Sequence, residues 1–426
     1  MATGGFRFST RLPKTKRIVL AILTTHPIQY QVPLWQALAR DGRVPFEVWY
    51  LSKHAAEVSR DRDFGKSFAW DLDMLAGYPH QFLDVNPGAA PNDFWKCRLR
   101  ESLASRMRNA GVKALWIQGW QVAAYWQAVW AAKKSGAEVW LRGESNDLAP
   151  TTIWKRAIKC VVLGQLFRRV DRFLYIGTAN RRLYEKFGVL RERLHPAPYA
   201  VDNERFRQQA NEIRKSKLEI RKQWKIPENA FCVLFCGKFI PKKRPMDLIA
   251  AAQLARRSLG EGGSLKIHLL FAGSGELGEQ LRANCNIVFD AENPNSSPAC
   301  PPEPWQRRVT RHSSLPIASF TGFLNQTEIS RAYVAADCLV LPSDYRETWG
   351  LVVNEAMTSG LHCVISDQCG CAEDLGAKEG NAVFRCGDVG ELADKLRIAS
   401  GSDPEIASAE LPSFSTTLET VAALYV

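Results

Sequence analysis

The stretch from Ala336 to Leu375, ADCLVLPSDYRETWGLVVNEAMTSGLHCVISDQCGCAEDL, carries the signals of a strand, a loop, a helix and a second strand. An apolar run at 338–341 ends at Pro342, and a polar loop follows it. Residues 350–358 then suit a helix, and residues 362–366 suit another strand. This order is typical of a parallel βαβ unit. Its loop lies at the carboxyl end of the strand, where open α/β sheets bind ligands.

Two carboxylates flank the start of the expected helix. Glu347 lies in the polar loop, and Glu355 follows eight residues later in the helix. A carboxylate accepts two hydrogen bonds and can hold a vicinal diol of a sugar, while a helix N-terminus attracts phosphate. Gly350, followed by Leu351, allows close approach of the backbone to a ligand. The pattern indicates recognition of a phosphorylated sugar. The alternative is that one carboxylate complements the helix dipole and the other faces solvent.

Length and composition indicate a globular protein of two or three domains. The chain has 426 residues, of which 46% are hydrophobic and 23% charged. Its apolar runs are shorter than a membrane span, and residues 1–10 lack the apolar core of a leader peptide. Eleven cysteines without a C-x-x-C pair favour reduced thiols over disulfides or zinc ligands. We therefore expect a cytoplasmic protein.

The net charge of +12 indicates an anionic partner, and the basic residues are clustered. Residues 7–17 hold five basic side chains and no acidic one, while 96–113 and 155–172 each hold six basic and one acidic. No zinc-finger spacing or RNA-recognition signature is present, so we expect no nucleic-acid partner. Phosphorylated substrates and an anionic membrane remain, the latter as a peripheral contact at the inner membrane face.

Two of the basic segments are expected to be helices. Residues 96–113 place Leu99, Leu103 and Met107 at intervals of four. Residues 153–169 have a basic face and an apolar face that contains Ile158, Val161, Val162 and Leu166. We interpret the second segment as a helix that packs its apolar face on the domain, with membrane docking as the alternative.

The loop after the apolar strand 232–236 is a candidate phosphate site. It begins at Gly237 and contains Lys238 and Lys243 among four cations before a helix. Cations around a strand-to-helix turn suit a pyrophosphate. The alternative is a basic loop that faces solvent, because its sequence would show the same pattern.

A second glycine-rich turn gives a rival signal. Residues 273–278, which include Gly273 and Gly275, satisfy G-x-G-x-x-G, and Asp290 follows at the end of a strand-like run. This is the pattern of a dinucleotide site. A complete βα unit precedes the turn and a proline-rich stretch follows it, which is poor context for such a site.

In the first half of the chain, His26 follows the first strand and Glu144 follows the strand at 138–142. Both loops lie at carboxyl ends of strands, so we expect both side chains at a cleft. The irregular stretch 52–95 is expected to shape the acceptor side. Thr178 is expected to cap its own helix.

The C-terminal half resembles the glycosyltransferases of family four. The resemblance rests on the E-x7-E pair Glu347/Glu355, the E-x-x-G-L run, the N-E-A-M tetrad at 354–357, and Gly360. It implies the GT-B fold, in which two Rossmann-like doubly wound α/β domains face a cleft. The expected division is 1–200 for the acceptor side, 201–228 as linker, 229–412 for the nucleotide sugar, and 413–426 as a final helix that crosses back.

The resemblance also implies an activity, namely transfer of a sugar from a UDP- or GDP-sugar donor with retention and without a metal or other cofactor. A glycan, lipid-linked or small-molecule acceptor would fit, as in polysaccharide biosynthesis. By the same resemblance Glu355 binds ribose, Glu347 lies against the sugar, Lys238 and Lys243 meet the phosphates, and the Gly273 turn lies near the nucleotide.

One departure concerns the acceptor domain. Many members of the family carry a His after the strand that corresponds to 113–118, and this chain has Gln118-Gly119-Trp120 there. Glu144 and His26 are the best-placed substitutes. Two other functions stay open: an NAD-type dehydrogenase that uses 273–278, and a non-catalytic partner subunit with the GT-B fold.

Overall fold

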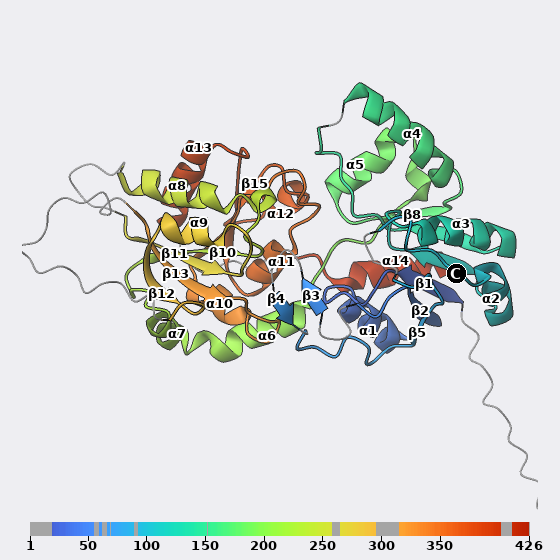
Figure 1. Ribbon diagram of the computed structural model, residues 1–426, viewed down its shortest axis with the longest axis horizontal. Coiled ribbons are helices and arrows are strands. Elements are labelled where there is room, and N and C mark those ends of the chain that lie inside the picture. The colour runs from blue at the N-terminus through green and yellow to red at the C-terminus, as the bar shows by residue number, and fades with distance from the viewer. Residues whose placement is uncertain are drawn as a thin grey trace, which may run out of the picture.

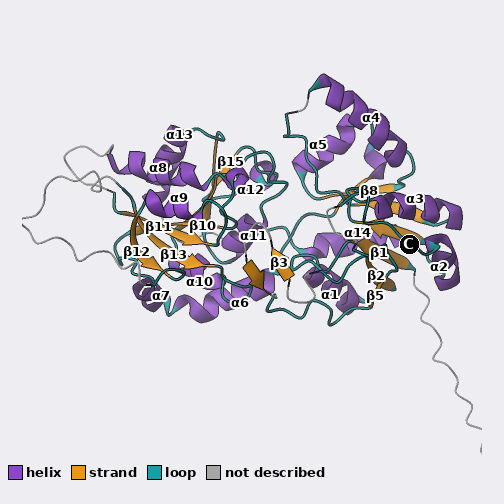
Figure 2. Cartoon of the chain, in the orientation of Figure 1, coloured by secondary structure: helices purple, strands orange, loops and turns teal. Residues whose placement is uncertain are grey.

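The computed structural model describes residues 19–54, 59–61, 66–68, 70–88, 93–150, 152–257, 265–294, 315–401 and 411–425. Within these ranges the chain forms two lobes, each built around a seven-stranded sheet (Figures 1 and 2). The basic segment 7–17 lies outside the described residues.

The N-terminal lobe is a doubly wound parallel sheet. Its strands run, in spatial order, β5 (His80–Phe82), β2 (Phe46–Tyr50), β1 (Leu20–Thr24), β6 (Ala114–Ile117), β7 (Glu138–Leu141), β8 (Arg172–Tyr175) and β9 (Leu194–Pro196). The lobe also contains α1 (Val32–Asp41), α2 (Leu103–Ala110), α3 (Ala123–Ser135), α4 (Ile153–Phe167), α5 (Thr178–Lys186) and the short antiparallel pair β3 (Ser59–Asp61) and β4 (Lys66–Phe68).

The C-terminal lobe repeats this plan. Its parallel sheet runs β12 (Asn286–Asp290), β13 (Ile317–Gly322), β11 (Ile267–Ala272), β10 (Phe231–Cys236), β14 (Cys338–Leu341), β15 (His362–Ser366) and β16 (Ala382–Phe384). Its helices are α8 (Pro245–Arg257), α9 (Gly278–Ala283), α10 (Ser330–Ala335), α11 (Leu351–Thr358), α12 (Ala372–Leu375) and α13 (Val389–Ser400).

In both sheets the order of strands reverses beside the first strand. β1 lies between β2 and β6, and β10 lies between β11 and β14. Loops leave in opposite directions at such a point, which opens a crevice at the carboxyl ends of the strands. The predicted fold class is confirmed, and β14, α11 and β15 lie where the opening stretch predicts them.

Three helices belong to the segments of chain that pass from one lobe to the other. Residues 201–228 contain α6 (Asn203–Arg214) and α7 (Lys217–Gln223), which pack against α10 of the C-terminal lobe. The last helix, α14 (Phe414–Tyr425), instead contacts α1 and β9 of the N-terminal lobe. In Figure 1 this red helix lies within the blue and green lobe.

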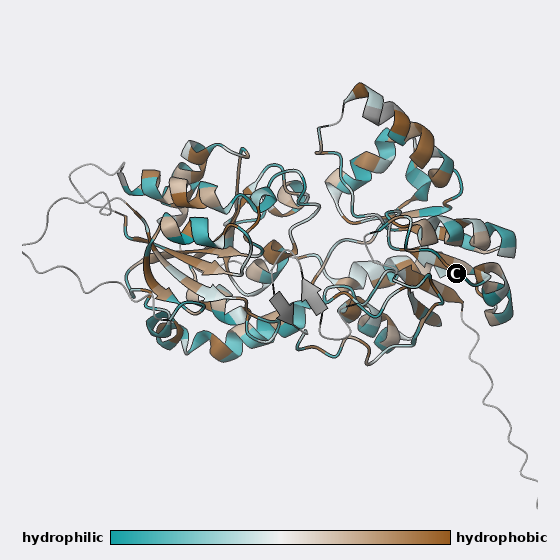
Figure 3. Cartoon of the chain, viewed as in Figure 1, coloured by the Kyte–Doolittle hydropathy of each residue, from teal (hydrophilic) through white to brown (hydrophobic). Residues whose placement is uncertain are grey.

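Two expectations about helices are wrong. Residues 96–102 are not helical: α2 begins at Leu103, and Leu99 forms an isolated bridge with Val85. The apolar face of α4 does not pack on its domain. Ile158 is 65% exposed and Val161 68%, and only the last turn is buried, at Leu166. Figure 3 shows this hydrophobic helix at the upper edge of the N-terminal lobe. Among the described residues, no helix has the length and apolar character needed to cross a membrane.

Each lobe supplies a carboxylate that caps a turn of the other. Asp71 accepts hydrogen bonds from the backbone N–H groups of Gln326 and Thr327, at 3.1 and 3.0 Å, and from the Thr327 hydroxyl. Asp374, in α12, accepts from the backbone N–H and the hydroxyl of Thr178 at the start of α5, at 3.0 and 2.7 Å. Thr178 therefore does not cap its own helix as expected, because its hydroxyl donates to the opposite lobe.

Close packing adds to these caps. Trp349, in the loop before α11, is buried against Gly177 of the N-terminal lobe. A Cβ atom at position 177 would lie 2.2 Å from Cζ3 of the Trp349 ring. The indole therefore needs a glycine on the opposite lobe.

We expect Asp71→Ala to loosen the closed arrangement of the lobes by about 1.5–3 kcal/mol, the range for hydrogen bonds to a charged group. Small-angle X-ray scattering should then give a larger radius of gyration. Asp73→Ala is the matched control, because Asp73 accepts hydrogen bonds only within its own loop, from Leu75 and Ala76. Equal radii for both variants would show that the Asp71 contact does not hold the lobes.

We expect Gly177→Ala to destabilise the protein by about 1–3 kcal/mol, the usual penalty for overpacking. Chemical denaturation would show this as a lower midpoint. Gly164→Ala, in α4, is the control, because a Cβ there meets no atom within 4 Å and alanine favours helix. A midpoint for Gly177→Ala at or above that of the control would contradict this account of the interface.

Candidate active site

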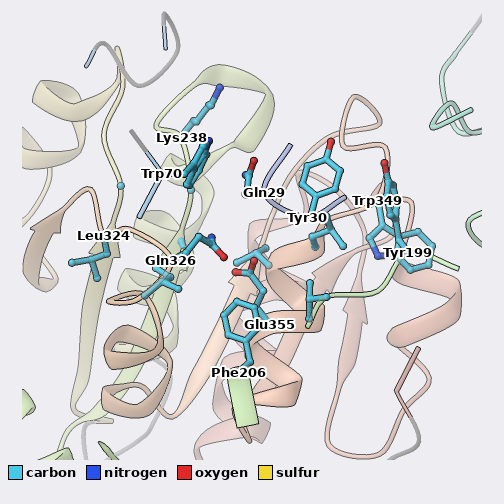
Figure 4. Close-up of a pocket in the computed structure, with 18 of the residues that line it drawn as sticks. Gln29, Tyr30, Trp70, Tyr199, Phe206, Lys238, Leu324, Gln326, Trp349 and Glu355 are labelled. Carbon is cyan, nitrogen blue, oxygen red and sulfur yellow. The ribbon is translucent and has the colours of Figure 1, made fainter. Parts of the chain in front are cut away.

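The two lobes enclose a cleft with a cavity volume of about 440 Å³, within the range of small-ligand sites. It lies where the loops after β1, β7, β10 and β14 meet. All predicted site residues line it except Gly275. Figure 4 shows side chains from both lobes around this space, with Lys238 on one side, Tyr30 and Tyr199 on the other, and Glu355 between them at the bottom.

The N-terminus of α11 opens onto the cleft. Its N-cap, Gly350, has φ +107° and gives no side-chain cap to the first turn, and both Leu351 and Val352 line the cavity. A Cβ at position 350 would lie 2.6 Å from a methyl group of Leu341, so glycine is needed for the turn as well as for its φ. This geometry presents the start of a helix, with its positive dipole end, to a bound anion.

A buried ion pair occupies the same wall. The Lys243 ammonium contacts the Glu347 carboxylate, and the two side chains are only 16% and 14% exposed. Burial acts to lower the pKa of Lys243, but the Glu347 charge and hydrogen bond outweigh it, so the net pKa is raised. Lys243 therefore stays cationic at the cleft, and the pair brings together two residues that the sequence separates by a hundred positions.

Glu355 lies deeper in the cleft and is held by a tyrosine. The Tyr333 hydroxyl donates a hydrogen bond of 2.5 Å to one carboxylate oxygen of Glu355. Burial raises the pKa of Glu355, while the Tyr333 hydrogen bond and the charge of Arg205 oppose that shift. One oxygen is thus fixed by the protein, and the carboxylate faces the cavity with its remaining acceptor capacity.

The cationic loop after β10 splits into two groups. Gly237, Lys238, Lys242 and Lys243 line the cleft. Arg244 instead turns away, adopts φ +49° and pairs with Asp247 at 2.7 Å. Three of the four cations noted in this loop therefore line the cleft.

In the second glycine turn, Gly275 is needed for close packing of the backbone. A Cβ there would lie 2.7 Å from the Phe239 carbonyl oxygen, and Gly273 similarly approaches Gly237. The turn follows β11, which is displaced from the β10–β14 reversal where a dinucleotide fingerprint belongs. Asp290 is paired with Arg282 at 2.7 Å. This placement counts against the dehydrogenase alternative.

The N-terminal wall carries Glu144 in a network of aromatic hydroxyls. The buried Tyr199 donates its hydroxyl to Glu144, and the Arg142 guanidinium lies 4.6 Å from the Tyr199 ring centroid. Burial and the Glu144 charge raise the pKa of Tyr199 far above its ordinary value, so the phenol stays protonated as a donor. The network fixes the Glu144 carboxylate at the cavity wall.

His26 lies at the same wall, where its Nδ1 is 2.9 Å from the Thr25 hydroxyl. Its ring is 5.2 Å from that of His54. Burial, and then the neighbouring His54, lower the pKa of His26 to about 4. The imidazole is therefore neutral at physiological pH and can accept a proton or a hydrogen bond.

Several cleft residues were not identified from the sequence as site residues. All but one come from segments between the expected motifs, and the exception, Trp349, lies inside the Glu347–Glu355 motif: Tyr30, Trp70, Tyr199, Arg205, Gln326 and Trp349. Trp70 faces Phe323 of the opposite lobe, and Arg205 bonds to Gln326 at 2.8 and 2.9 Å. The stretch 52–95 was expected to shape the acceptor side, yet Trp70 contacts the C-terminal lobe. The adjacent aromatic and acidic residues Trp70-Asp71 were the feature of the sequence from which this contact could have been predicted.

No group of three or more His, Cys, Asp or Glu side chains within the described ranges is arranged to hold a metal ion.

Comparison with known proteins identifies a family segment in the C-terminal lobe. Residues 316–406 match the family described as "Glycosyl transferases group 1". A D-inositol 3-phosphate glycosyltransferase of Thermomonospora curvata is 28% identical over 210 residues, which is 49% of this chain and 44% of the relative. The sulfoquinovosyl transferase SQD2 of Arabidopsis thaliana is 45% identical over 84 residues, 19% of this chain and 16% of the relative. The chain spans less than half the length of these curated relatives.

Solved structures share the whole fold. A glycosyltransferase from Rickettsia africae superposes with a TM-score of 0.62 at 11% identity, covering 96% of this chain and 98% of that one. HepE of Anabaena, solved in complex with UDP and glucose, superposes with a TM-score of 0.57 at 14% identity, covering 96% and 95%. At such identities the likeness concerns the fold. Residues 316–406 thus form a group 1 glycosyltransferase segment, and the chain that carries it has the two-lobed GT-B fold of glycosyltransferases.

Proposed function

We propose that the protein transfers a sugar from a UDP- or GDP-sugar to a hydroxyl group of a glycan, lipid-linked or small-molecule acceptor. The carrying observation is the composition of one cleft: cations, a helix N-terminus and two carboxylates on the C-terminal wall face Glu144 and His26 on the N-terminal wall. HepE, which shares the fold, is bound to UDP and to UDP-glucose in its crystal structures.

The proposed donor pose follows from the chemistry of each group. Lys238 and Lys243, together with the N-terminus of α11, bind the diphosphate. Glu355 accepts hydrogen bonds from the ribose diol, and Glu347 lies against the sugar. An ammonium has three donors, so Lys243 can keep its contact with Glu347 while it also contacts a phosphate oxygen.

In the proposed reaction the bond between the anomeric carbon and the diphosphate oxygen breaks, and its electron pair leaves with the nucleoside diphosphate. The acceptor oxygen bonds to the anomeric carbon and gives its proton to the departing diphosphate. The cations and the α11 dipole stabilise the charge on the departing diphosphate, which is the role that a metal ion would otherwise have. We propose that transfer needs no metal and retains the anomeric configuration, as the resemblance to family four implies.

We expect Glu355→Gln to weaken nucleotide binding by roughly 1.5–3 kcal/mol, because an amide lacks the charge that strengthens the diol hydrogen bonds. A thermal-shift panel of UDP, GDP, ADP and NAD first identifies the nucleotide, since a ligand at a hundred times its Kd stabilises by about 2.7 kcal/mol. Calorimetry then compares the variants. Wild-type affinity should also fall as the pH drops toward the raised pKa of Glu355, because protonation removes the charged acceptor.

Glu379→Gln is the control for this variant, since Glu379 is exposed and does not line the cleft. Unchanged affinity in Glu355→Gln would remove Glu355 from the nucleotide site. Stabilisation by NAD alone would favour the dehydrogenase. Hydrolysis of a nucleotide sugar that persists in EDTA would exclude a non-catalytic subunit and support metal-independent chemistry.

We expect Glu144→Ala to lower kcat with little change in donor affinity, the pattern of an interaction made mainly in the transition state. A loss of about tenfold or more is expected if Glu144 acts on a proton in transit. His26→Ala should act in the same direction more weakly. Donor hydrolysis and donor binding are measured side by side.

Glu138→Ala is the matched control, because Glu138 lies at the opposite end of β7 from Glu144. Full activity in both Glu144→Ala and His26→Ala, with saturating acceptor, would show that the N-terminal wall acts through other residues.

A further inference from the structure

Helix α4 stands out from the N-terminal lobe with an uncovered apolar face. Only its C-terminal end joins the core, through the buried Leu166 and Phe167 and the partly buried Leu163. The rest of the helix exposes its large apolar side chains: Ile153 at 84%, Trp154 at 81%, Ile158 at 65%, Val161 at 68% and Val162 at 47%. In Figure 1 the helix lies at the top of the lobe, away from the C-terminal lobe.

The exposed side chains form one surface. Trp154, Ile158, Val161 and Val162 recur at intervals of three and four residues, which places them on the same side of a helix. We call these four residues the α4 face. Soluble proteins rarely leave so contiguous an apolar surface in water unless it binds something.

The positive charge around the α4 face indicates an anionic partner. From 148 to 170 the chain has five basic residues, Lys155, Arg156, Lys159, Arg168 and Arg169, and no acidic residue. Lys159 and Arg168 are exposed, and Arg169 lies 3.6 Å from the ring centroid of the half-exposed Trp130. An apolar strip that includes a Trp, with cations along it, is the composition of a helix that lies in the headgroup region of an anionic bilayer.

We propose that the α4 face docks on an anionic membrane surface, with Trp154, Ile158, Val161 and Val162 in the headgroup–acyl boundary and with Lys159 and Arg168 on lipid phosphates. The helix is 15 residues long and lies on the membrane without crossing it. The surface is a single projecting helix and not a groove, which suits a planar partner. A second copy of this chain would bring the two sets of cations together without an acidic counterpart.

The position of α4 relates docking to the cleft. Glu144 lines the cleft directly after β7, and α4 begins nine residues later along the same loop. A lipid-linked acceptor held in the bilayer would then meet the N-terminal wall of the cleft. This last point rests on the proposed function, whereas docking itself does not.

The test is sedimentation of the full-length protein with phosphatidylcholine vesicles, with and without phosphatidylglycerol. We expect binding about tenfold tighter or more on the anionic vesicles, because several basic residues act together, and a decline as salt is raised. Ile158→Ser/Val161→Ser should weaken this binding about tenfold. Lys159→Glu should weaken it on anionic vesicles only.

Matched controls come from equally exposed positions elsewhere. Leu190→Ser/Leu218→Ser replaces aliphatic side chains that are 59% and 56% exposed, and Lys222→Glu reverses an exposed charge on α7. Both should bind like the parent protein. Quenching of tryptophan fluorescence by brominated lipid should fall in Trp154→Phe, which reports insertion at the α4 face itself.

Three results would overturn the proposal: no binding to anionic vesicles, equal binding to neutral ones, or unchanged binding by Ile158→Ser/Val161→Ser. A dimer in solution that this double variant abolishes, in a protein that ignores vesicles, would assign the α4 face to a second copy. Donor hydrolysis without vesicles is measured in each variant, so a loss of docking is distinguished from a loss of activity.

Discussion

The parallel direction of all strands in each main sheet is the constraint on which the rest of the structure depends. It sends every loop that follows a strand to one edge, so residues from distant parts of the chain meet there. Lys243 follows β10 and Glu347 follows β14, and the reversal of strand order beside β10 makes these two loops neighbours. At that edge the Glu347 charge and hydrogen bond outweigh the effect of burial, so the pKa of Lys243 is raised and Lys243 stays cationic.

The carboxyl-end edges of the two sheets face one another across the cleft. Contacts between the lobes hold them in this arrangement. Asp71 and Asp374 each cap a turn of the opposite lobe, and Trp349 packs on Gly177. Asp71 directly follows Trp70, which lines the cleft, so this loop both shapes the cavity and helps to set the separation of its walls, whereas Asp374 acts from α12. A group on the N-terminal wall, such as Glu144, is thereby kept opposite the C-terminal wall.

Much of this arrangement was predictable from local pattern. The strand–loop–helix–strand order of 336–375 specifies a βαβ unit, and the E-x7-E pair lies at the edge that lines the cleft. His26, Glu144 and Lys238 could be placed at the cleft because each follows the carboxyl end of a parallel strand. The carboxyl ends of the strands in such a sheet all lie at the edge where ligands bind. Gly275 is the exception among the predicted site residues, because it does not line the cleft. Its motif fits a nucleotide site. In the structure, however, the absence of a Cβ at Gly275 allows the backbone of Phe239 to pack closely against it.

What the sequence by itself determined is therefore the repeated βα order and the cleft residues that follow strands, such as His26, Glu144 and Lys243, because period, turn residues and strand ends are local properties. The tertiary structure decided which surfaces are covered. The periodicity of α4 is the same whether its apolar face packs on a domain or meets a partner, and only the fold shows Ile158 and Val161 in solvent. It likewise decided that Asp374, and not Thr178, caps α5, since a cap is supplied by whichever acceptor lies closest in space, and that distance is set by the docking of one lobe on the other.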